Sequence, residues 1–159
     1  MADKLTKVEL DQCAQALGAC ACVNLRKSSR AVTRLFDEEL EACGLRSTQL
    51  TILLTIAALE RPTQTRIARE LVAEQSTISR NLKILSGEGL IKTTAVRGTP
   101  YRTISLTPKG IKRIREAIPI WTRTQQAFVE KFGQKQWAAS LDSLSKAVSS
   151  VHAIERSTD

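Results

Sequence analysis

The chain has 159 residues, enough for one domain with a hydrophobic core; 42% of them are hydrophobic and 25% are charged. This composition excludes a disordered or collagen-like chain. The first residues lack the apolar segment of a secretion signal and no stretch is apolar enough to span a bilayer, so we expect a cytoplasmic protein with reduced cysteines and no membrane partner.

The net charge of +8 is concentrated in one third of the chain. The segment from Arg61 to Glu116 holds twelve Lys or Arg residues and four acidic residues, which accounts for the whole excess, and basic and acidic residues cancel elsewhere. Such a concentration favours a surface that binds a polyanion over a solvated basic face without a partner.

The N-terminal third is predicted to be helical. Apolar residues recur at spacings of three or four from residue 8 to residue 43, which predicts one helix, and Gly44 is its C-cap. Ser47 or Thr48 is the predicted N-cap of a second helix, QLTILLTIAAL, which Pro62 ends. Because this helix is apolar on nearly every side, we expect it at the centre of the core.

Two short helices and a hairpin are predicted next. The first helix lies near residues 64–71 and the second is QSTISRNLKIL, with Ile78, Leu82 and Leu85 on one face. Residues 90–96 and 102–107 alternate in the manner of β-strands around the turn formers Gly98-Thr99-Pro100.

The last third is predicted to form two helices with apolar seams. One begins at Thr107-Pro108 and the other follows Gly133, and in both the apolar residues alternate at spacings of three and four. These seams predict helix-to-helix packing, either within the chain or across a dimer.

Two short helices followed by a hairpin, in the segment that carries the charge excess, predict a winged helix-turn-helix. The fold class is therefore mainly α with a small β-hairpin wing. In such a fold the second helix enters the major groove of DNA, so its early turns must be polar or basic while its opposite face packs on the core.

The predicted DNA-binding residues lie on this helix and on the hairpin. We expect Ser76, Thr77 and Arg80 to read the sequence, and Lys83 to meet the backbone. Arg97 and Arg102 flank the tip of the wing, from which they would reach the adjacent minor groove. The full predicted set is Ser76, Thr77, Ser79, Arg80, Lys83, Arg97 and Arg102.

Four segments resemble the MarR family of bacterial transcription regulators: NLRKSSRAVTRLF, LRSTQLTILLTI, RIARELVAEQSTISRNLKILSGEGLI and ISLTPKG. The resemblance implies a single MarR-like domain over residues 1–159, with dimerisation helices at 8–44 and 108–155 and a DNA-binding part at 47–107. It also implies a homodimer that binds a pseudo-palindromic operator of double-stranded DNA. The Asp-x-Arg of the family's wing corresponds here to Gly98 and Pro100, so the role of its arginine is transferred to Arg97 or Arg102.

The four cysteines allow several interpretations. The stretch CVNLRKSSRAVT resembles the one that begins with the reactive cysteine of organic-hydroperoxide-sensing MarR repressors, which implies a redox role for Cys22. The tyrosines of those relatives correspond here to Arg26, Phe36 and Ser47. The alternative is that Cys22 is a small hydrophobe packed beside its apolar neighbours on the helix.

No catalytic or metal site is predicted. Cys20 and Cys22 would lie on opposite sides of one helix and could not share a metal ion, and the only histidine, His152, is in the last helix. We therefore expect neither an enzyme nor a cofactor.

The sequence predicts a DNA-binding transcriptional regulator, and regulators of this kind are most often repressors. We expect a small-molecule effector or an oxidant to release it from DNA by changing the spacing of the two DNA-binding parts of the dimer. Two alternatives remain open: a winged helix that binds an acidic protein rather than DNA, and a thiol-based metal sensor.

Overall fold

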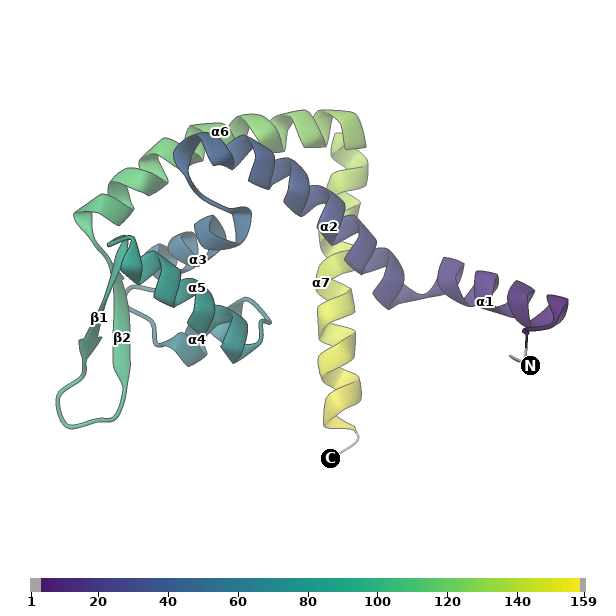
Figure 1. The fold of residues 1–159 in the computed structure, drawn as a ribbon, viewed down its shortest axis with the longest axis horizontal. Coiled ribbons are helices and arrows are strands. Elements are labelled where there is room, and N and C mark those ends of the chain that lie inside the picture. Colours follow the sequence, from purple (N-terminus) through teal and green to yellow (C-terminus); the bar gives the residue numbers. More distant parts are fainter. Residues whose placement is uncertain (1–3, 158–159) are drawn as a thin grey trace. The chain divides into compact units, whose positions relative to one another are not determined.

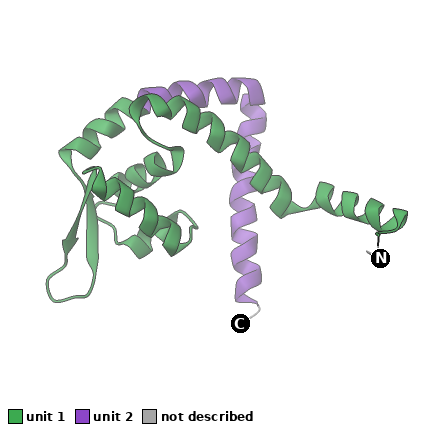
Figure 2. Cartoon of the chain, in the orientation of Figure 1, with its two compact units in different colours: residues 1–117 green, residues 118–159 purple. Residues whose placement is uncertain are grey.

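The computed structural model describes residues 4–157. The chain divides into two compact units, Met1–Ala117 and Ile118–Asp159, which Figure 2 distinguishes by colour. The elements follow in the order α1 (Lys7–Ala19), α2 (Ala21–Leu40), the 3-10 turn η1 (Glu41–Cys43), α3 (Ser47–Ala58), α4 (Gln64–Glu70), α5 (Gln75–Gly87), β1 (Ile91–Ala95), β2 (Arg102–Leu106), α6 (Pro108–Phe132) and α7 (Gln134–Arg156) (Figure 1). The predicted class, mainly α with one small hairpin, is confirmed.

Helix α3 is the centre of the core of the first unit, as its all-round apolar sequence predicts. Leu50, Leu53 and Ile56 are each at most 2% exposed, and α3 contacts α2, α4 and β2. Burial of each such side chain contributes about 1.5–3 kcal/mol, so this helix anchors the elements around it.

The start of α3 is held differently from the prediction. Ser47 is the first residue of the helix, and neither Ser47 nor Thr48 caps it. Instead Asp37 of α2 accepts a hydrogen bond from the Ser47 N–H through Oδ1 at 2.7 Å, and the N-cap residue, Arg46, lies 3.6 Å from the other carboxylate oxygen. A carboxylate at a helix N-terminus satisfies a free N–H and complements the helix dipole.

The single helix predicted for residues 8–43 is wrong, because Cys20 interrupts it. Cys20 has extended backbone angles (φ −66°, ψ 115°), so it ends α1 and begins α2. The Asn24 side-chain amide donates to the carbonyl oxygens of Gly18 (3.0 Å) and Cys20 (2.9 Å). Gly18 weakens the last turn of α1, and the Asn24 amide forms hydrogen bonds with carbonyl oxygens at the break. Together these two effects favour two helices over one.

Gly44 ends the N-terminal helical region, as predicted. It has a left-handed backbone (φ 66°), and its N–H donates to the carbonyl oxygen of Glu41 at 2.9 Å. Such a conformation favours glycine because other residues carry a Cβ that crowds it.

The hairpin is joined firmly to the elements on either side. β1 and β2 are antiparallel, with Ile91 opposite Leu106 and Ala95 opposite Arg102. The Ile104 N–H donates to the carbonyl oxygen of Pro62 at 2.9 Å, which ties β2 to the loop before α4.

The start of α6 is also tied to the hairpin. The Thr107 hydroxyl donates to the Gly89 carbonyl oxygen (2.7 Å) and accepts from the Gly110 N–H (3.0 Å), which confirms Thr107 as the predicted N-cap of α6. At Gly110 the helix passes so close to the Leu90 carbonyl that an added Cβ would collide with it.

Several helix faces are uncovered in the single chain. No residue of α1 or α7 is buried. Leu141, Leu144, Val148 and Val151 form the predicted seam of α7 and are between 42% and 52% exposed. At the start of α7, Trp137 packs edge-on against Phe128 and Phe132 of α6, with ring centroids 5.3 and 6.0 Å away. No helix within residues 4–157 combines the length and the apolar character needed to cross a bilayer.

Candidate nucleic-acid interface

Helix α5 has one buried face and one exposed polar face. Ile78, Leu82 and Leu85 are at most 8% exposed, and they fix the rotation of the helix against the core. This rotation leaves all five of the predicted helix residues exposed, namely Ser76, Thr77, Ser79, Arg80 and Lys83. The helix carries two basic residues and no acidic residue, so its exposed face is electropositive.

Arg80 is oriented by its own helix. Its Nε donates to the carbonyl oxygen of Ser76 at 3.2 Å, which holds the guanidinium beside the first turn of α5. The two terminal amino groups are left to donate elsewhere, and they have the geometry that pairs with two acceptors on one guanine or with a phosphate.

The wing brings the two predicted hairpin arginines to different places. Arg102 lines a groove of about 310 Å³ together with Lys83, Gln64 and Thr93, so it lies on the side of the hairpin that faces α5. Arg97 lies in the tip, where the Thr99 N–H donates to the carbonyl oxygen of Val96 at 3.2 Å. Both arginines are exposed. The sequence gives no reason to distinguish the two arginines, whereas in the structure Arg102 lines a groove with Lys83 of α5 and Arg97 does not.

The tip itself requires glycine. Gly98 has φ 77°, a left-handed conformation that other residues adopt only with strain. The departure from the family's Asp-x-Arg pattern at this position is therefore accompanied by a tight turn that glycine stabilises.

Gln64 is a residue of the interface that the sequence does not reveal. Its side-chain amide donates to the carbonyl oxygen of Gln75 at 3.3 Å, which joins the first turn of α4 to the start of α5, and its side chain lines the groove with Lys83 and Arg102. These residues are distant in sequence and only the fold brings them together, so no local pattern indicates the grouping.

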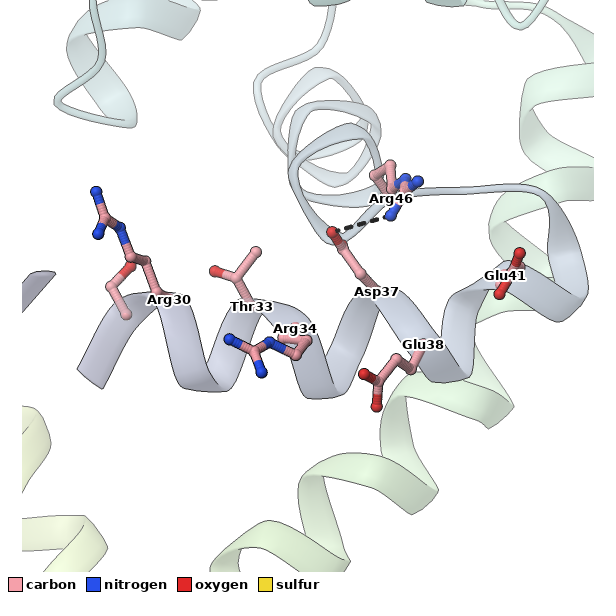
Figure 3. Close-up of a pocket in the computed structure, with 8 residues that line it drawn as sticks. Arg30, Thr33, Arg34, Asp37, Glu38, Glu41 and Arg46 are labelled. Atoms are coloured by element: carbon pink, nitrogen blue, oxygen red, sulfur yellow. Dashed lines mark ion pairs between the residues drawn. The ribbon is translucent and has the colours of Figure 1, made fainter. Parts of the chain in front are cut away.

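A second groove, about 410 Å³ in volume, lies at the junction of α2 and α3 (Figure 3). Its lining residues are mostly charged and comprise Ser29, Arg30, Thr33, Arg34, Asp37, Glu38, Glu41 and Arg46. Figure 3 shows the ion pair between Arg46 and Asp37, with Glu41 on one side of it and Arg30 and Thr33 on the other. The carboxylate that holds the start of α3 is therefore also a wall of this groove.

The cysteines do not lie as predicted. Cys22 is exposed on α2, so it does not pack as a small hydrophobe within the single chain. Cys20 is outside both helices, so the argument that placed it opposite Cys22 on one helix is wrong. The Cys43 thiol is half-buried and donates to the Leu40 carbonyl oxygen at 3.1 Å. Among the described residues, no three His, Cys, Asp or Glu side chains are grouped as a metal site would require.

The arrangement of α4, α5 and the hairpin defines a winged helix-turn-helix, a class in which the second helix and the wing contact nucleic acid. The model of the MarR family matches residues 45–95, the part that contains α3, α4, α5 and β1. No curated protein matches the chain in sequence.

Solved structures of transcription regulators have the same fold over most of the chain. The M. tuberculosis regulator MosR in complex with DNA has 26% identity and a TM-score of 0.77, covering 84% of this chain and 97% of that one. The repressor CouR bound to p-coumaroyl-CoA has 25% identity and a TM-score of 0.74, covering 84% of this chain and 94% of that one. The S. aureus MepR–DNA complex, at 24% identity and a TM-score of 0.70 over 82% of this chain and 96% of that one, shares the fold.

These matches confirm the predicted resemblance to the MarR family. The matched structures are those of transcriptional regulators and repressors, in agreement with the prediction of a regulator rather than an enzyme.

Proposed function

We propose that the chain represses transcription by binding a pseudo-palindromic DNA operator as a homodimer. The observation that carries this proposal is the exposed polar face of α5, on which the charged residues are the basic Arg80 and Lys83. The opposite face of α5 is fixed in the core, and the neighbouring wing has two exposed arginines. A DNA-binding regulator is what the matched family and structures support. This function places the protein in the cytoplasm, where bacterial DNA lies.

The proposed DNA contacts are of two kinds, those to base edges and those to the sugar–phosphate backbone or minor groove. Ser76, Thr77 and Arg80 lie in the first two turns of α5 and read base edges in the major groove, while Ser79 contacts the nearby backbone. Lys83 and Arg102 share a groove and bind phosphate, and Arg97 at the tip enters the minor groove.

The uncovered helix faces support the homodimer. In α1, Val8, Leu10 and Leu17 are between 54% and 66% exposed, and the seam of α7 is similarly exposed. Exposed apolar side chains in such numbers mark a protein interface, and a two-fold partner would cover the same face on each chain. We assign the predicted dimerisation segments, 8–44 and 108–155, to this contact. Two equivalent copies of α5 would then meet half-sites about 34–36 Å apart or a multiple of that.

We propose that an organic anion releases the operator by binding in the groove at the α2–α3 junction. An anion that pairs with Arg46 would compete with Asp37, and Asp37 holds the first N–H of α3. The similar repressor CouR is bound to an acyl-CoA, which is an organic anion. Thiol oxidation at Cys22 is a second route to release, favoured by the exposure of that residue.

The proposal is tested by selecting bound fragments from genomic DNA and measuring their affinity by fluorescence anisotropy. We expect tight binding that organic acids or a hydroperoxide weaken, and the hydroperoxide effect should be absent in Cys22→Ser. Absence of any duplex binding at low ionic strength would contradict the proposal and favour a winged helix that binds an acidic protein. Stoichiometric metal retained by the purified protein would favour a metal sensor.

A further inference from the structure

A third groove lies where the loop before α4 meets the wing. Its volume is about 570 Å³, and it is lined by Leu59, Arg61, Pro62, Thr63, Thr65, Arg66, Arg69 and Tyr101. All three arginines and the tyrosine are exposed. None of the lining residues is acidic, and none of these arginines forms an ion pair within the described part of the chain. We call this surface the arginine groove.

The arginine groove and the groove that holds Lys83 lie on opposite faces of the wing. Gln64 and Arg102 line the groove beside α5, whereas the residues next to them in sequence, Thr65 and Tyr101, line the arginine groove. The Val96 N–H donates to the Tyr101 carbonyl oxygen at 3.0 Å, so the strand pairing continues to this residue. Successive side chains of an extended strand point to opposite faces, which explains why Tyr101 and Arg102 line different grooves.

Arg61 lies in a strained backbone conformation. Glu60 and Arg61 both have positive φ angles, 48° and 70°, in which glycine would be less strained. A position with this conformation that nevertheless carries a long cationic side chain suggests that the side chain has a function outside the fold.

We propose that the arginine groove binds the sugar–phosphate backbone of the DNA strand on the far side of the wing. This inference rests on the proposed DNA-binding function. A wing that enters a minor groove has one phosphate backbone on each of its two sides. Lys83 and Arg102 face the backbone next to α5, and the arginine groove, which is lined by no acidic residue, borders the opposite face. Phosphate, which is anionic and exposed along the whole strand, matches three unpaired guanidinium groups.

The test compares the double variant Arg66→Gln/Arg69→Gln with a control that removes the same charge outside the predicted DNA-binding and dimerisation segments, Lys4→Gln/Lys7→Gln. The probe is a selected genomic duplex of about 30 base pairs, close to three helical turns. Loss of two phosphate contacts in each of two protomers should make the slope of log K against log salt less negative by about 3–4, at about 0.9 for each phosphate. The ratio of affinities for selected and random duplexes should stay unchanged, because backbone contacts carry no sequence information.

Two further measurements separate a contact from a folding defect. Hydroxyl-radical footprinting should show that the double variant loses protection on one strand beside the minor groove bound by the wing and keeps it over the major groove. Arg61→Gly should weaken DNA binding without lowering the unfolding midpoint, since glycine tolerates the left-handed backbone.

The outcomes distinguish this inference from the function on which it rests. If the wild-type protein binds DNA and the double variant has the same salt slope and footprint, the arginine groove does not bind DNA and the inference is overturned. If the wild-type protein binds no duplex, the proposed function fails together with it.

Discussion

Replacing Asp37 by alanine removes the acceptor of the first N–H of α3. The lost hydrogen bond is the one from the Ser47 N–H at 2.7 Å, to a carboxylate whose side chain is 20% exposed. Loss of an N-cap acceptor costs about 0.5–2 kcal/mol, and hydrogen bonds to charged groups lie at the upper end. The ion pair to Arg46 adds little, because the arginine side chain is 72% exposed and 3.6 Å away. We expect a loss of about 1–2 kcal/mol.

Thermal unfolding at fixed protein concentration measures this loss. A change of 1 kcal/mol shifts the Tm of a domain of this size by about 2–4 °C, so Asp37→Ala should lower it by roughly 2–8 °C. Arg46→Ala should cost below about 0.5 kcal/mol, as should Glu38→Ala, which lines the same groove without holding α3. Equal losses for Asp37→Ala and Arg46→Ala would refute the reasoning, because the ion pair would then be the stabilising contact.

Three further predictions follow from single contacts. Arg80→Ala should weaken operator binding by about 1–3 kcal/mol and relax its sequence preference in an anisotropy titration; unchanged affinity and footprint would remove Arg80 from the interface. Gly110→Ala should lower the free energy of unfolding by about 1–3 kcal/mol or more, because its Cβ meets the Leu90 carbonyl, whereas Gly87→Ala, with open space around it, should be neutral or slightly stabilising in the same denaturant titration. The hydrogen bonds from Thr6, first from its backbone N–H and then from its hydroxyl, lower the pKa of Glu9, so the stabilisation of α1 is present above the ordinary glutamate pKa of about 4.3 and is lost as the pH falls through the lowered value. Glu9→Gln should abolish that part of the pH dependence of helical circular dichroism, and an identical titration in the variant would count against the capping contact.

Local patterns predicted the winged part of the fold well. The apolar spacing of α5, the alternation of the hairpin and the Thr107-Pro108 helix start are each encoded within a few residues, and the structure contains all three. The rotation of α5 follows from the same spacing, since whichever face is apolar must pack on the core. For this reason the exposed positions of the helix could also be predicted.

Features that depend on contacts between elements could not be predicted in this way. Apolar periodicity continues past Cys20, so it does not indicate the break between α1 and α2. At this break the Asn24 side-chain amide donates to two carbonyl oxygens. The acceptor for the first N–H of α3 comes from Asp37, ten residues earlier and on another helix, so the local sequence around Ser47 does not indicate it. The arginine groove is lined by both Arg69 and Tyr101, which are distant in sequence and are brought together by the contact of β2 with the loop before α4.

The most direct test of the account is the affinity of the full chain for a selected duplex as a function of salt. If α5 and the wings of a dimer bind DNA as described, log K should fall linearly with log salt by about 0.9 for each phosphate contacted, and sedimentation should show two protomers on each operator. Affinity that is independent of salt, or a monomer that ignores duplex DNA at low ionic strength, would contradict it.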